Sequence, residues 1–364
     1  MFERRLEKPD GRPLILYNRD SRGPIPILPA PSPNAVRQRP RSHMRWHPLR
    51  GEWVAYATHR QDRTFLPPKE YNPLAPSKPG DHPTELPAGP YDVAVFENLF
   101  PTLLPTPGEP PGGLPVPTRT GYGVCEVVVF TQDPTSSLGQ LPLDHIELLF
   151  EVWGQRTAEI GAREGIAYVM PFENRGVEVG VTLHHPHGQI YSYPFLPPLA
   201  ERELSEQRRY HAETGVSLLA ALVQDEVEAK ERVIYEGDEI VAFVPACARY
   251  AYEVWIAPRA AVGRLDLLTK QQRADFARAL KTVLRKYDLL WNRPFPYLMA
   301  FHQGATGAPP PPYAHMHIEF SPPLRSRDKL KFLAGTELGA GMFAADSLPE
   351  EKAAELRAVA VDFD

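Results

Sequence analysis

The stretch HPHGQIY, residues 185–191, places two histidines two positions apart in a segment of strand character. Side chains at i and i+2 of a β-strand project from the same face, so we expect His185 and His187 to point the same way. Gly188 lets a phosphate approach the backbone, and the amide of Gln189 can donate to a phosphoryl oxygen. Neutral imidazole is a good nucleophile toward phosphorus near pH 7. Core filling and metal binding are the alternative uses of such a histidine pair.

A similar order of predicted elements returns about 130 residues later. β-branched and aromatic runs predict strands, and apolar residues at helical spacing behind a capping-box pattern predict helices. The first set comprises strands at 91–99, 123–132 and 168–172, a helix near 143–163 headed by Asp144-x-x-Glu147, and the strand with HPHGQIY. The second comprises strands at 239–245, 250–257 and 297–301, a helix headed by Thr269-x-x-Gln272, and HMH at 315–317. We therefore expect a duplicated α+β unit.

Proline is unusually frequent, at 42 of the 364 residues, about twice the average share. It is concentrated in the segments that we expect to connect the helices and strands. Regular helix cannot persist in such proline-rich runs. We expect four parts: an extended proline-rich arm (1–45), a first half with the nucleophile (46–198), a crossing charged helical segment (199–232) and a second half (233–364).

The bulk properties exclude several classes of protein. A formal net charge of -5 gives no positive excess for binding a nucleic-acid backbone. No apolar run is long enough to span a membrane, and the N-terminus has no secretory apolar stretch, so we expect a cytoplasmic protein. The only two cysteines, Cys125 and Cys247, form no recognisable zinc or redox pair.

Three motifs resemble one known family: FENRG at 172–176, HPHGQIY at 185–191 and HMH at 315–317. They are similar to galactose-1-phosphate uridylyltransferases, a branch of the histidine-triad superfamily, from about residue 43 to the C-terminus. The resemblance implies an α+β fold of duplicated histidine-triad-like units, with antiparallel sheets and helices packed on one face. It also implies a homodimer with shared active sites. In that family a histidine takes UMP from UDP-glucose and passes it to galactose 1-phosphate in a ping-pong cycle.

Residue roles follow from the same resemblance. His187 would be the nucleophile, the carbonyl of His185 would hold its other ring nitrogen, and Gln189 would stabilise the phosphoryl oxygens. The substrate-binding positions would be Arg60 and Arg63 for phosphate across the dimer interface, Asn98 and Phe100 for the nucleoside, Asn174 and Thr182 for phosphate, and Lys331, Phe332 and Glu337 for the hexose. A solvated turn is the alternative for the arginine pair, and a charged loop for the C-terminal set.

The two metal sites of the family differ in this sequence. At the first, Asn72, Ala75 and Pro134 stand where the resemblance implies a cysteine pair and a histidine, so His185 alone cannot hold Zn²⁺. We expect no metal there, with packing and hydrogen bonds in its place. At the second, the matching residues are Glu203, His302, His315 and His317. They imply one structural divalent ion, zinc or iron, and a metal-free cluster of buried histidines is the alternative.

Three functions stay open on the sequence. The first is uridylyl exchange between UDP-glucose and galactose 1-phosphate, and the second uses the same histidine with another nucleotide sugar such as an ADP-sugar, as transferase or phosphorylase. The third is a silent nucleotide-binding module, which the intact HPHGQ disfavours, because binding alone needs no aligned nucleophile. The sequence departs from the family pattern at the sugar site, because Thr336 stands beside Glu337 where many family members carry an aromatic residue.

Overall fold

The computed structural model describes residues 1–363 except 22, 32–40, 63–70, 79 and 81. Its strands are β1 (Phe2–Glu7), β2 (Pro13–Asn18), β3 (His43–His47), β4 (Glu52–Tyr56), β5 (Val93–Glu97), β6 (Thr118–Thr120), β7 (Cys125–Val129), β8 (Tyr168–Arg175), β9 (His187–Tyr193), β10 (Val233–Glu236), β11 (Ile240–Phe243), β12 (Val254–Pro258), β13 (Tyr297–His302), β14 (His317–Ser321), β15 (Leu324–Ser326) and β16 (Lys329–Leu330). Its α-helices are α1 (Leu143–Gly161), α2 (Pro198–Thr214), α3 (Leu218–Ala229), α4 (Lys270–Leu290) and α5 (Pro349–Ala358).

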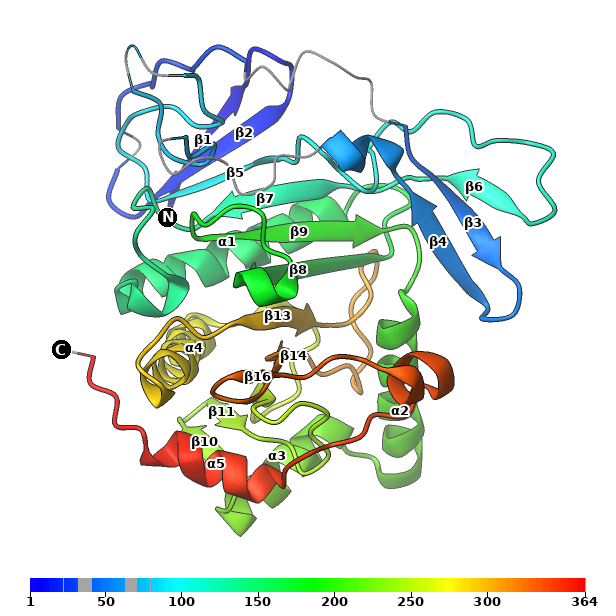
Figure 1. Ribbon diagram of the computed structural model, residues 1–364, viewed down its shortest axis with the longest axis vertical. Coiled ribbons are helices and arrows are strands. Elements are labelled where there is room, and N and C mark those ends of the chain that lie inside the picture. Colours follow the sequence, from blue (N-terminus) through cyan, green and yellow to red (C-terminus); the bar gives the residue numbers. More distant parts are fainter. Residues whose placement is uncertain (22, 32–40, 63–70, 79, 81, 364) are drawn as a thin grey trace.

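Eleven of the described strands form one large antiparallel sheet, in the order β1-β2-β5-β7-β9-β8-β13-β14-β12-β11-β10 (Figure 1). Four strands of the first half run β5-β7-β9-β8, and four of the second run β13-β14-β12-β11. The second run repeats the first in reverse, so the two units meet at β8 and β13, where Glu173 pairs with Met299. The predicted fold class, duplicated α+β units with antiparallel sheets, is confirmed.

Helices α1 and α4 pack together on one face of this sheet, and α1 lies behind β7 and β9 in Figure 1. The rings of Phe150 and Phe276 stack between them at 5.2 Å. Both rings are buried in one core with Val169 of β8 and Ile318 of β14, which joins the two halves. The opposite face is left for the functional side chains of β9.

The two expected capping boxes have different outcomes. At α4 the prediction is confirmed, because Thr269 accepts from the Gln272 backbone and the Gln272 side chain accepts in return. At α1 it is wrong, because the helix begins after Pro142 with no side-chain cap. Asp144 therefore lies inside the first turn, where its carboxylate suits the helix dipole and pairs with Arg19 at 2.6 Å.

Within residues 1–45, strands β1 and β2 form a hairpin that pairs with β5. Strands β4, β3 and β6 form a separate sheet that projects from the body (Figure 1). The expected division of the chain into four parts stays a prediction. In the described part of the chain, no helix combines the length and apolar character needed to cross a membrane.

Candidate active site

His187 is the first residue of β9 and is held by the backbone just before it. Its Nδ1 lies 2.7 Å from the carbonyl oxygen of His185. A carbonyl oxygen only accepts, so Nδ1 carries the proton and Nε2 keeps the lone pair. Burial lowers the pKa of His187, and the bond to the His185 carbonyl opposes this shift in part. The ring is therefore neutral near pH 7, the form that attacks phosphorus.

His185 precedes β9, which begins at His187, and both histidines border the larger of two cavities described below. The ring of His185 bonds at both nitrogens: Nε2 lies 2.7 Å from the carbonyl oxygen of Thr131, and Nδ1 lies 3.0 Å from Nδ2 of Asn72. No lone pair on this ring is left for a metal. Ala75 and Pro134 supply no ligand atom either, so these residues do not fit a zinc ion.

Two cavities border His187. The smaller, of about 140 Å³, has walls of Leu74, Phe96, Leu99, Phe100 and Val127 and polar groups from Arg60, Asn98, Thr182 and Gln189. The larger, of about 680 Å³, is bordered by Asn174, Arg175 and Arg285 among others. Leu183 borders both cavities, so they lie on either side of the segment that leads into β9. The imidazole of His187 thus stands between a mainly apolar space and a larger one lined by charged side chains of both signs.

Gln189 lies on β9 two residues after His187 and borders the small cavity. Its Oε1 accepts from Nδ2 of Asn98 at 3.2 Å, and Oδ1 of Asn98 accepts from the backbone N–H of Phe100 at 2.8 Å. A backbone N–H only donates, so the atom of Asn98 that faces Phe100 is its oxygen. This fixes the orientation of the Asn98 amide, which in turn fixes the orientation of the Gln189 amide. Gln189 therefore turns its NH₂ group, a donor, away from Asn98.

Arg60 borders the small cavity of its own chain. Its guanidinium donates to the Phe100 carbonyl at 2.7 Å and to the Tyr191 hydroxyl at 3.2 Å. Two bonds to fixed partners hold a positive charge beside the cavity. Arg63, the other member of the expected pair, lies outside the described residues.

The remaining predicted substrate residues separate into two groups. Asn174 borders the large cavity and Thr182 the small one. Lys331, Phe332 and Glu337 border neither of these cavities. Lys331 Nζ lies 3.6 Å from a Glu337 oxygen, and Phe332 is 76% exposed. A single chain therefore does not bring the C-terminal set to His187.

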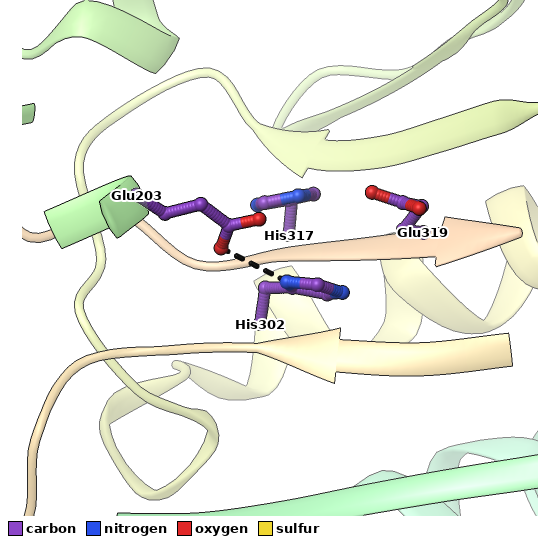
Figure 2. A group of neighbouring side chains, drawn as sticks. All are labelled: Glu203, His302, His317 and Glu319. Carbon is purple, nitrogen blue, oxygen red and sulfur yellow. Dashed lines mark hydrogen bonds and ion pairs between the residues drawn. The ribbon is translucent and has the colours of Figure 1, made fainter. Parts of the chain in front are cut away.

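A second cluster, formed by Glu203, His302, His317 and Glu319, has ligand atoms within 4.8 Å of one another (Figure 2). Glu203 Oε2 lies 2.9 Å from His302 Nδ1, and the rings of His302 and His317 stack at 4.8 Å. His317 Nδ1 is buried with no hydrogen-bond partner among the described residues. Two imidazoles, two carboxylates and an unpaired ring nitrogen fit a divalent cation such as zinc or iron.

His315, expected in this cluster, lies outside it. Its Nε2 is 3.0 Å from the Pro258 carbonyl oxygen and its Nδ1 is 2.9 Å from Ser217 Oγ, so both ring nitrogens are engaged. Glu319, which sequence reasoning missed, takes the fourth place. Strand alternation was the available signal, because β14 begins at His317 and the next residue on that face is Glu319.

The two histidine motifs repeat one backbone arrangement. His185 bonds the carbonyl of Thr131 just beyond β7, and His315 bonds the carbonyl of Pro258 at the end of β12. Strands β7 and β12 hold corresponding places in the two four-strand runs. In each copy the first histidine is anchored, and the second, on the strand, is left for chemistry or for a metal.

Comparisons with known proteins agree with this geometry. Family models for the N-terminal and C-terminal domains of galactose-1-phosphate uridyl transferase match residues 34–197 and 203–363. A galactose-1-phosphate uridylyltransferase of Thermotoga maritima is 39% identical over 324 residues, covering 88% of this chain and 99% of that protein. One from Streptomyces lividans is 36% identical over 302 residues, covering 82% and 79%. A solved uridylyltransferase structure superposes with a TM-score of 0.77 at 32% identity, covering 87% of this chain and 97% of the other.

Proposed function

The chain belongs to the galactose-1-phosphate uridylyltransferase family, a family of enzymes, and on this basis we propose that it exchanges UMP between UDP-glucose and galactose 1-phosphate through a covalent uridylyl-His187. The observation that carries the proposal is the imidazole of His187. Its Nδ1 donates to the His185 carbonyl, so its Nε2 lone pair is available at a point bordered by two cavities. Neither a silent binding module nor a structural histidine needs that alignment.

In the first half-reaction, the Nε2 lone pair of His187 attacks the α-phosphorus of UDP-glucose. The bond from this phosphorus to the bridging oxygen breaks, and glucose 1-phosphate leaves with the electron pair. The Nδ1 proton stays on the ring, and the His185 carbonyl stabilises the positive charge that forms there. In the second half-reaction, a phosphate oxygen of galactose 1-phosphate attacks the same phosphorus and the P–N bond breaks, which restores neutral His187.

The two cavities suit the two ends of such a substrate. Apolar walls with a few polar groups suit a nucleoside, so we assign uridine to the smaller cavity, beside Asn98 and Phe100. Negative charge develops on the non-bridging oxygens near His187, where the NH₂ of Gln189 and the hydroxyl of Thr182 are donors. We assign the sugar phosphate to the larger cavity, where Asn174 can bond its hydroxyl or phosphate oxygens.

A homodimer completes this proposal. Lys331, Phe332 and Glu337 border neither cavity of their own chain, and Phe332 is largely exposed. A hexose-binding role for these residues therefore requires a second copy of the chain. In the partner, the same segment would close the sugar-phosphate cavity.

One divalent ion, zinc or iron, belongs to the proposal as a structural element. Glu203, His302, His317 and Glu319 would hold it, and it would supply positive charge between the half-buried carboxylate of Glu203 and the buried carboxylate of Glu319. The cluster links α2 to strands β13 and β14. These residues would tie the crossing helix to the second half.

Intact-mass measurement tests the proposal. Incubation with UDP-glucose should add one uridylyl group to the protein, and galactose 1-phosphate should remove it. His187→Asn should abolish the gain, because no ring nitrogen remains to attack. His211→Asn is the matched control. His211 lies on α2, its ring contacts Tyr313, and it borders neither cavity, so labelling should persist.

The negative outcomes are also informative. No covalent gain with any nucleotide sugar would overturn the transferase proposal. A gain with ADP-glucose but not UDP-glucose would keep the histidine chemistry and replace the nucleotide.

A further inference from the structure

Asn72 contacts the residue that holds the nucleophile, although it lies 113 positions away from it in the sequence. Its Oδ1 accepts from the backbone N–H of Leu74 at 3.1 Å. Because that N–H can only donate, the oxygen of the Asn72 amide must face Leu74 and the NH₂ must face His185. The amide orientation is thus assigned by its own backbone turn, independently of the histidine.

The ring of His185 is held from both sides. Its Nε2 donates to the Thr131 carbonyl, so its lone pair is on Nδ1, where it accepts from the Asn72 NH₂. A proton on Nδ1 would point at the amide hydrogens of Asn72, so these contacts admit only the neutral ring. Burial lowers the pKa of His185, the nearby His187 acts in the same direction, and Asp133 and the Thr131 carbonyl oppose them.

We propose that Asn72 is a positioning residue for the transfer reaction: its amide keeps the His185 ring neutral and fixed, so that the His185 carbonyl holds the Nδ1–H of His187. This inference rests on the proposed function. The nitrogen lone pair that Asn72 occupies is the only one on that ring, and therefore the one that a metal would have taken. The N–H of Asn72 thus fixes the tautomer and orientation of the His185 ring, as a metal at this position would, but adds no charge beside the nucleophile.

Asn72→Asp is the sharpest perturbation. The carboxylate keeps an oxygen for the Leu74 N–H, so the local turn is retained, but it can only accept from His185. The exchange should draw a proton onto Nδ1 and make His185 cationic over a wider pH range. A positive ring two residues before His187 would lower the basicity of the nucleophile and weaken its attack.

Two readouts test this. The first is the single-turnover rate of labelling by UDP-glucose between pH 5.5 and 9, and the second is the ¹⁵N NMR signal of His185, which reports its tautomer and charge. In the wild type we expect a neutral ring with the proton on Nε2. In Asn72→Asp we expect His185 to titrate at higher pH and labelling to slow by about 10-fold to 100-fold where it is protonated, with recovery as pH rises. The dissociation constant for UDP-glucose should change little.

Two further variants separate the loss of the hydrogen bond from the effect of the added charge and from nonspecific effects. Asn72→Ala removes the donor without adding a charge, so it should slow labelling without the new pH dependence. Asn18→Asp is the matched control, because the exposed Asn18 amide donates to the Pro90 carbonyl away from the site, and it should behave as wild type. Circular dichroism and the NMR spectrum of each variant establish that it folds. If Asn72→Asp does not fold, Asn72→Ala decides the rate effect.

Wild-type labelling kinetics and an unchanged His185 signal in the Asn72 variants would overturn the inference. A wild-type protein that takes no label from any nucleotide sugar would instead overturn the proposed function and the transfer role of Asn72 with it. The NMR experiment would still decide, in that case, whether Asn72 sets the state of His185.

Discussion

Glu319→Gln should weaken divalent metal binding, whereas His315→Asn should leave it intact. Glu319 lies in the cluster whose ligand atoms are within 4.8 Å of one another, and it provides one of the two carboxylates of that cluster. His315 has both ring nitrogens engaged, by Ser217 and by the Pro258 carbonyl. The two substitutions therefore separate a ligand from a neighbour on the same short segment.

The expected magnitude follows from linkage between metal binding and folding. Loss of a group that only orients a metal ligand already costs about 10-fold to 100-fold in affinity, so loss of a charged ligand should cost at least about 100-fold. At a free metal concentration about 100 times the wild-type dissociation constant, a 100-fold loss lowers the stabilisation by metal from about 2.7 to about 0.4 kcal/mol. His315→Asn loses hydrogen bonds to Ser217 and Pro258 and should destabilise by about 1–3 kcal/mol. That cost should be the same with and without metal.

The assay is urea unfolding of each variant with metal and with a chelator, together with metal content by mass spectrometry after dialysis. The chelator should lower the free energy of unfolding of the wild type and of His315→Asn alike, and have little effect on Glu319→Gln. The opposite pattern, with metal lost from His315→Asn and kept by Glu319→Gln, would refute the cluster drawn in Figure 2.

Two other predictions concern buried charge. Arg156→Met should destabilise the fold by about 3–5 kcal/mol, because it leaves the carboxylate of Glu126 buried without the guanidinium that now lies 2.7 Å from it. Replacing both residues by methionine should cost less. Urea unfolding of the wild type, the single variant and the double variant checks this. The labelling rate at His187 should fall to half of its plateau only below about pH 6.5, because a histidine pKa lowered from its ordinary value keeps most rings neutral at that pH; a midpoint above pH 6.5 in single-turnover measurements would contradict the assignment.

Local pattern was enough for the order of the elements that recur in the two halves. Apolar spacing placed α1 and α4, and β-branched runs placed β7 and β8, because burial of one helix or strand face leaves a period in the sequence. The α1 boundary shows the limit of such patterns. Asp144-x-x-Glu147 reads as a capping box, yet Pro142 starts the helix two residues earlier and no side chain caps it.

The sequence by itself determined the doubled order of strands and helices and singled out His187 with Gln189, since these depend on residue type and on spacing within one strand. Only the tertiary structure decided which distant groups meet them. Asn72 reaches His185, and Glu319 rather than His315 lies in the candidate metal cluster, because sheet register and the first residue of each strand set which side chains face one another. Spacing along a chain reports the faces of single elements, whereas contacts between residues a hundred positions apart depend on how the whole sheet closes around its core.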